Sequence, residues 1–121
     1  MPKFFAAVIL TLIFSTAHAA MVQLTCRDKY EKEDPIVLKI DTTAVEMEVD
    51  GRSVSTTEVG NKFIGKRSFA MADLGLDFKK TYSVDRVTME MRVETTQVRR
   101  AASATKTFEY DYVCRRSAAQ F

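Results

Sequence analysis

One segment of this sequence matches the spacing of a phosphate-binding loop, in which backbone amides hold a nucleotide phosphate. The segment GNKFIGKRS places Gly60, Gly65 and Lys66 in the pattern G-x-x-x-x-G-K, but Arg67 stands where a magnesium-binding hydroxyl should follow. Such a loop also needs a buried strand before it and a long helix after it. Here the preceding segment is polar and the following one is interrupted by Gly75. We therefore expect a strand that contains glycines.

A second pattern, SATK at residues 103–106, has the S-x-x-K spacing that lets a lysine activate a serine from the next helical turn. Lys106 begins a segment that alternates like a strand, so the helical geometry is not expected. The companion motifs of penicillin-recognising enzymes are absent, and the chain is too short for their fold. We expect no serine chemistry at Ser103.

Glu46 and Glu48 form a third pattern, a pair of carboxylates on one strand face. They lie roughly 7 Å apart at the usual rise per residue, which falls in the range used by inverting glycosidases. In a glycosidase, burial must raise the pKa of one carboxyl. These two residues alternate with apolar neighbours and so are expected to face solvent, and the chain has no tryptophan to stack on a sugar.

The first nineteen residues have the pattern of a secretory signal peptide. Lys3 precedes an apolar run from Phe4 to Phe14, and Ala17-His18-Ala19 forms an A-x-A cleavage site. The run is too short to span a bilayer, which takes roughly 20 apolar residues. We expect cleavage after Ala19, no remaining membrane span, and one exported domain at residues 20–121 in the periplasm or outside the cell.

Cleavage changes the chemistry that the chain can perform. His18 is the only histidine, so the mature chain would have none for nucleophilic catalysis or metal binding. The formal charge of +2 also falls, because Lys3 is lost. A nearly neutral domain has no electrostatic bias toward nucleic acid. We expect a non-enzymatic protein without a metal or cofactor.

Cys26 and Cys114 are the two cysteines. Cys26 is in phase with Val22 and Leu24, and Cys114 is in phase with the aromatic residues of FEYDYVC, so each cysteine lies on the expected buried face of a strand. In an oxidising compartment they are expected to form a disulfide that links the first and last strands.

Short alternating segments dominate the rest of the chain. They comprise IVLKID, VEMEV with Val45, Met47 and Val49 inward, and VTMEMRV with Val87, Met89, Met91 and Val93 inward. Asp50-Gly51 predicts a tight hairpin. The polar segment Arg52–Val59 is expected to be an edge strand, and residues 70–77 are compatible with a helical turn or a loop. This pattern predicts an all-β fold, a small antiparallel β-sandwich or open β-barrel of about 6–8 strands.

Four basic pairs stand out, and one lies in a segment without acidic residues. Arg99 and Arg100 fall within Gln97–Thr105, which we expect to be a polar loop and a contact surface for an acidic partner. The remaining pairs, expected to keep the surface soluble, are Lys66-Arg67, Lys79-Lys80 and Arg115-Arg116.

The layout of a signal peptide, a terminal cysteine pair, short strands and the phrase TYSVDR resembles small exported proteins of Gram-negative bacteria. Some of those inhibit lysozymes, but their serine-glycine, tyrosine and tryptophan signature is absent from this chain. Three hypotheses follow. The first is a protein-binding module of the cell envelope, acting through an exposed edge such as Arg52–Val59. The others are an inhibitor of a secreted enzyme, acting through Gln97–Thr105, and a lipid or small-ligand carrier with a methionine-rich interior.

Overall fold

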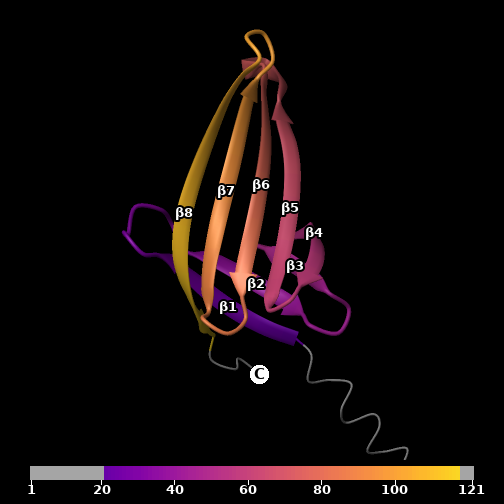
Figure 1. The fold of residues 1–121 in the computed structure, drawn as a ribbon, viewed down its shortest axis with the longest axis vertical. Coiled ribbons are helices and arrows are strands. Elements are labelled where there is room, and N and C mark those ends of the chain that lie inside the picture. The colour runs from indigo at the N-terminus through magenta and orange to yellow at the C-terminus, as the bar shows by residue number, and fades with distance from the viewer. Residues whose placement is uncertain (1–20, 118–121) are drawn as a thin grey trace, which may run out of the picture.

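A computed structural model describes residues 21–117, which form a closed antiparallel barrel of eight strands paired in sequence order (Figure 1). The all-β prediction is confirmed, and the barrel is closed. Within residues 21–117, no helix is long and apolar enough to cross a membrane. The predicted signal peptide lies outside the described residues. The strands are β1 (Met21–Asp28), β2 (Ile36–Asp41), β3 (Glu46–Val49), β4 (Arg52–Val59), β5 (Lys62–Met71), β6 (Leu76–Asp85), β7 (Glu90–Arg99) and β8 (Ala104–Arg116).

A disulfide between Cys26 and Cys114 closes the barrel, as the sequence predicted. The two residues are direct partners in the β1–β8 register, with their Cα atoms 3.9 Å apart. The neighbouring hydrogen bond from Lys29 N to Asp111 O, 2.9 Å long, shows that odd-numbered residues of β8 bond to β1. Cys114 therefore occupies a non-hydrogen-bonded position, where facing side chains approach most closely. The cross-link lies at the seam between the first and last strands.

Unequal strand lengths divide the barrel into two parts. β8 pairs with β1 only from Tyr112 to Arg116, and β5 pairs with β4 only from Lys62 to Lys66. Beyond these points β5–β8 continue as a four-stranded sheet with no strand opposite, seen as the tall part of Figure 1. We call this part, residues 67–71, 76–80, 95–99 and 104–108, the sheet extension.

The turns follow local sequence chemistry. Asp50 and Gly51 both have positive φ, +49° and +82°, as a two-residue type I′ hairpin requires. A single 3₁₀ turn at Ala72–Leu74 ends at Gly75 in the left-handed region and connects β5 to β6. This turn lies within residues 70–77, the segment for which the sequence left a helical turn or a loop open.

Three expectations for strand boundaries and faces are wrong. β4 is not an edge strand, because Arg52–Val54 pair with β3 and Ser55–Val59 pair with β5. The expected loop Gln97–Thr105 is a hairpin instead, with β7 reaching Arg99 and β8 beginning at Ala104. Val87 is 72% exposed in the turn between β6 and β7 and does not face inward.

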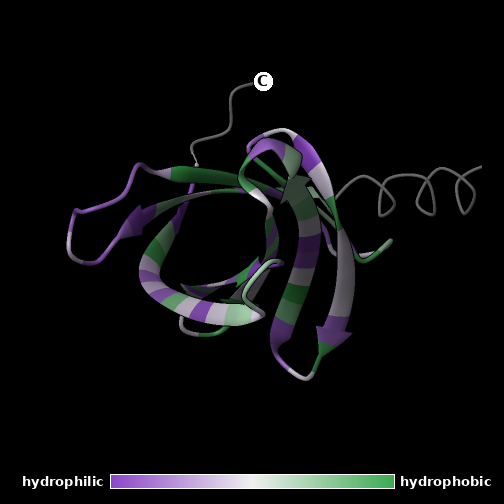
Figure 2. Ribbon diagram, turned by 90° about the horizontal axis from the view of Figure 1, so that it is seen from above, coloured by the Kyte–Doolittle hydropathy of each residue, from purple (hydrophilic) through white to green (hydrophobic). Residues whose placement is uncertain are grey.

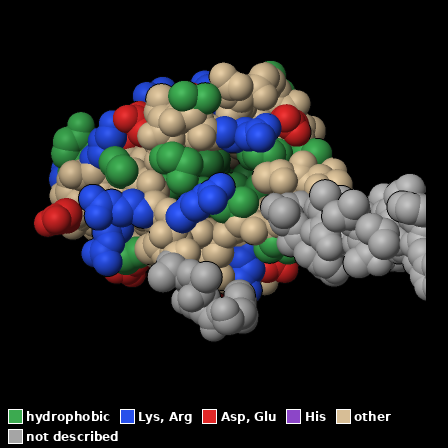
Figure 3. Space-filling view, turned by 90° about the horizontal axis from the view of Figure 1, so that it is seen from below, with side chains coloured by type: hydrophobic (Ala, Val, Ile, Leu, Met, Phe, Trp, Pro, Cys, Tyr) green, Lys and Arg blue, Asp and Glu red, His purple; other side chains and the backbone are tan. Residues whose placement is uncertain are grey.

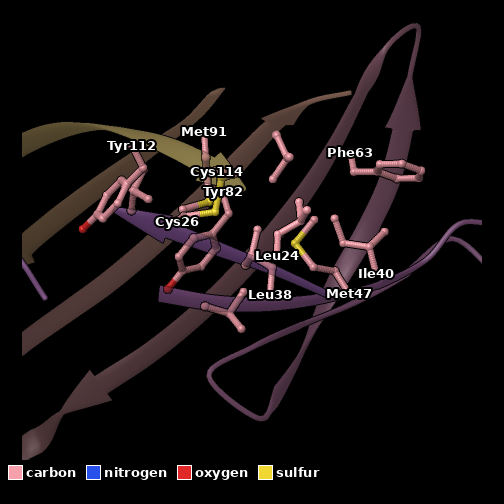
Figure 4. Packing of buried hydrophobic residues seen from close by; sticks show 13 residues of the cluster. Leu24, Cys26, Leu38, Ile40, Met47, Phe63, Tyr82, Met91, Tyr112 and Cys114 are labelled. Carbon is pink, nitrogen blue, oxygen red and sulfur yellow. A yellow bond between two sulfur atoms is a disulfide. The ribbon is translucent and has the colours of Figure 1, made fainter. Parts of the chain in front are cut away.

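Buried side chains fill the base of the barrel (Figure 4). Along the strands, apolar and polar residues alternate (Figure 2), and the inward positions form one buried cluster around the disulfide. Its largest fully buried side chains include Phe63, Leu38, Met47 and Met91. Gly65 lies among them at an inward position of β5, where a Cβ atom would come within 2.7 Å of Val54 Cγ2 and 3.1 Å of Met47 Sδ.

We expect loss of the disulfide to lower the free energy of unfolding by about 4–5 kcal/mol, because the cross-link spans 88 residues. Urea unfolding of the double variant Cys26→Ala/Cys114→Ala measures this loss. Wild-type protein treated with reductant is the matched control, since it loses the cross-link and keeps the sulfur atoms. An unchanged urea midpoint in both samples contradicts the expectation.

We expect Gly65→Ala to destabilise the barrel by about 1–3 kcal/mol, because the added methyl overpacks against Val54. Ser68→Ala, at an exposed position of the same strand, is the control and should stay within about 0.5 kcal/mol of wild type. Equal urea midpoints for the two variants would show that Val54 can move aside at little cost.

Candidate functional site

The register of β5–β8 aligns inward-facing residues in rows that run across the four strands. One row is Arg67, Lys80, Thr95 and Phe108. The next row outward is Phe69, Phe78, Gln97 and Lys106, and the last is Met71, Leu76, Arg99 and Ala104. These rows share the phase of the buried residues Phe63, Tyr82 and Tyr112 below them. They therefore form the inner face of the sheet extension, which we call the concave face.

The concave face carries positive charge alone. Its four charged side chains are those of Arg67, Lys80, Arg99 and Lys106. No carboxylate occupies an inward position on any of the described strands β5–β8. Such a one-signed surface produces a positive potential that attracts anions.

The carboxylates of these strands all occupy the outer face, where several of them pair with cations. Among the described residues, ion pairs join Arg92 to Asp111 at 3.2 Å and Arg100 to Asp77 at 2.9 Å. Two further pairs, Lys29–Glu90 and Arg86–Glu58, lie near the base. None of these pairs includes a cation of the concave face. The net charge of the whole chain therefore conceals a strong difference between the two faces of one sheet.

Aromatic rings accompany the cations. Phe69 and Phe78 stack with ring centroids 5.0 Å apart, and the Arg67 guanidinium lies 4.7 Å above the Phe69 ring. Phe108 is 40% exposed on the same face. The Phe69 ring therefore orients the Arg67 guanidinium, and a preorganised arginine loses less conformational freedom when it forms hydrogen bonds.

Arg67 and Lys80 are direct cross-strand partners. Like charges at such positions have Cβ atoms about 4.5–5.5 Å apart and destabilise the sheet. A bound anion would relieve that repulsion.

The two arginines predicted to bind a partner have different surroundings. Arg99 lies exposed at the outer end of the concave face. Arg100 lies in the β7–β8 turn and donates from Nε and Nη2 to the two carboxylate oxygens of Asp77, at 3.1 and 2.9 Å. This hydrogen-bonded ion pair raises the pKa of the Arg100 guanidinium. Arg100 therefore has a local structural partner, and a binding role for either residue stays a prediction.

Sequence reasoning missed Arg67, Lys80 and Lys106 as members of one site. The first two were assigned to pairs that keep the surface soluble. The signal lay in the spacing Arg67, Phe69, Met71 and in the spacing Lys106, Phe108, Tyr110, in which cations alternate in phase with aromatic and apolar residues. Their assembly depends on strand register, which the sequence alone does not supply.

Tyrosines form the floor below the concave face. Tyr82 and Tyr112 are 4% exposed. Burial raises the pKa of Tyr82, an effect that nearby Arg67 opposes. Burial also raises the pKa of Tyr112 to about 12, and the negative charges of Glu33 and Asp28 add to the shift. Both tyrosines are therefore neutral at physiological pH and can act as hydrogen-bond donors.

The lower end of the barrel offers a depression of about 200 Å³, with apolar side chains at the centre and basic ones around it (Figure 3). Ligand pockets usually measure about 300–1,000 Å³. Arg86 at this rim already pairs with Glu58 at 3.1 Å and stacks on Phe63. The depression is lined by Val22, Leu24, Ile40, Thr42, Phe63, Val84, Arg86, Met89 and Arg116. This end of the barrel gives little support to the carrier hypothesis.

The other motifs do not form catalytic geometry. Gly65 and Lys66 lie within β5, so no loop-to-helix junction surrounds them. Ser103 lies in a turn and Lys106 in β8. Glu46 is exposed on β3, and Glu48, two residues along, is half-buried. Within residues 21–117, no group of histidine, cysteine or acidic residues is arranged to hold a metal ion.

The fold and the concave face define a class: an up-and-down antiparallel β-barrel, closed by a disulfide and opening into a cationic sheet extension. No protein-family model matches the chain, and no curated protein or solved structure shows significant similarity to it.

We expect the folded state to lose stability as the pH rises from about 10 to about 12, because Tyr112 ionises less readily when folded than when unfolded. The stability that Tyr112 contributes is complete below its unfolded pKa of about 10, and it is lost as the pH rises past its pKa in the folded state. Urea midpoints of wild type and Tyr112→Phe, compared across this range, measure the effect. The variant should lose less stability than wild type, and parallel losses contradict the expectation.

Proposed function

We propose that this protein is a non-catalytic binding module of the exported compartment, and that it binds an acidic segment of a partner protein on the concave face. The observation that carries the proposal is the segregation of charge, with Arg67, Lys80, Arg99 and Lys106 inward and the carboxylates of the same strands outward. The disulfide fits export, because such bonds persist in the periplasm and outside the cell.

The chemistry of the site favours a carboxylate-bearing polypeptide. Arginine binds a carboxylate through two parallel hydrogen bonds, and Arg67 is already oriented by its contact with Phe69. The exposed ring of Phe108 and the side chains of Met71 and Leu76 supply apolar contacts beside the cations. A segment that mixes acidic and apolar residues would use both kinds of contact.

The enzyme-inhibitor hypothesis receives less support. It calls for a protruding loop at Gln97–Thr105, and the structure has a short hairpin turn whose Arg100 is bound to Asp77. Inhibition through the concave face remains compatible with the proposal, since the partner could be a secreted enzyme that presents an acidic segment.

The proposal is tested by fluorescence anisotropy with a labelled, short, alternating Glu–Thr peptide at low and high salt. We expect salt-sensitive binding and a loss of about tenfold or more in the double variant Arg67→Gln/Lys80→Gln, because hydrogen bonds to charged groups contribute about 1.5–3 kcal/mol each. The matched control, Lys66→Gln/Lys79→Gln, removes two cations from the outer face of the same strands and should bind like wild type.

Two results overturn the proposal. One is an equal loss in the inner-face and outer-face variants, which would show that only net charge matters. The other is tighter binding of a single-stranded oligonucleotide than of a peptide with the same number of negative charges. That result would indicate that the partner is a phosphate polymer and not a protein.

A further inference from the structure

The first half of β8 has a free backbone edge. Every residue of β7 pairs with a residue of β8, from Glu90↔Val113 to Arg99↔Ala104. On the other side, β1 reaches only as far as Tyr112, with one further hydrogen bond from Lys29 N to Asp111 O. In the described part of the chain, no strand pairs with this side of residues 104–110, and Figure 1 shows β8 at the border of the sheet.

The direction of the free hydrogen-bonding groups follows from two measured bonds. Cys114 N donates to Met89 O at 2.8 Å, so even-numbered residues of β8 direct their backbone groups toward the β7 side. Asp111 O accepts from β1, so odd-numbered residues direct theirs away from β7. By this alternation, Thr105, Thr107 and Glu109 present backbone N–H and C=O groups at the free edge.

We propose that an extended acidic segment of a partner protein adds to this edge as a further strand, hydrogen-bonded to the backbone of Thr105, Thr107 and Glu109. This inference rests on the proposed function and places one part of the bound segment, which would contact Lys106 and Phe108 of β8. Lys80 on β6 and Arg67 on β5 lie two and three strands away, so the chain that continues from the added strand would cover them. Strand addition gives affinity through main-chain hydrogen bonds and specificity through alternate side chains.

Side-chain chemistry on the two faces of β8 selects the partner. Lys106 and Phe108 lie on the concave face, so inward residues of an added strand would meet a cation and an aromatic ring. Thr105, Thr107 and Glu109 lie on the outer face, where Glu109 disfavours a second carboxylate opposite it. The fitting segment therefore alternates, with acidic or apolar residues inward and neutral polar residues outward.

A second copy of this chain is a poorer occupant of the edge. Pairing β8 with its own copy would bring two concave faces side by side, each with four inward cations and no inward carboxylate on the described strands β5–β8. Repulsion between them opposes such a dimer, whereas an acidic strand neutralises the same charges.

The test uses Thr107→Pro and the alternating Glu–Thr peptide. Proline removes the Thr107 N–H from the free edge and leaves the β7 ladder intact, which is why proline is tolerated at sheet edges. We expect affinity to fall about tenfold or more, since a main-chain hydrogen bond is lost and the ring obstructs the added strand. Thr107→Val keeps the N–H and should bind like wild type.

Amide hydrogen exchange provides a second measurement on the unmodified protein, in case Thr107→Pro does not fold. Bound peptide should slow amide exchange at Thr105, Thr107 and Glu109 relative to the same residues of the free protein. Unchanged exchange at all three residues, with the peptide bound, overturns the inference.

The outcomes separate the two proposals. If Arg67→Gln/Lys80→Gln weakens binding while Thr107→Pro binds like Thr107→Val, the proposed function stands and strand addition is wrong. If neither variant weakens binding, both fall. Sedimentation that shows a wild-type dimer and a monomeric Thr107→Pro variant would assign the edge to a second copy and also overturn the inference.

Discussion

Pairing of β1 with β8, fixed by the Cys26–Cys114 disulfide, is the constraint on which the rest of the structure depends. It joins the two ends of an otherwise open antiparallel sheet, so the inward faces of all eight strands meet in one core. A domain of this size buries only about 60–70% of the surface its unfolded chain exposes. A covalent link at the seam therefore contributes a large share of a stability that is typically about 5–15 kcal/mol.

Strand length determines where the barrel stays open. β3 has four residues and β2 has six, whereas β5, β6 and β7 have ten and β8 has thirteen. The short strands close only the base, and the remaining length of β5–β8 has solvent on both faces. Because inward positions there need not be apolar, they can carry Arg67, Lys80 and Lys106 beside phenylalanine rings. Core formation and exposure of a charged face thus follow from one mismatch in strand length.

Local sequence patterns predicted the base of the barrel well and the sheet extension poorly. Alternation located Leu38, Met47 and Met91 in the core, and Asp50-Gly51 marked its hairpin correctly. Residues 97–105 were interpreted as a loop because both faces of β7 and β8 are solvated there, which removes the apolar alternation that marks a strand. β4 was interpreted as an edge strand because its residues are polar. In the structure, its first three residues pair with β3 and its last five pair with β5.

The sequence by itself determined the all-β class, the inward phase of the strands and the pairing of Cys26 with Cys114, since two cysteines at inward positions have one possible partner each. Only the tertiary structure decided the closure of the barrel, the free edge of β8 and the gathering of four cations on one face. These features depend on register between strands far apart in the chain. Register is set by the summed packing of the core, and no short segment of the sequence encodes it.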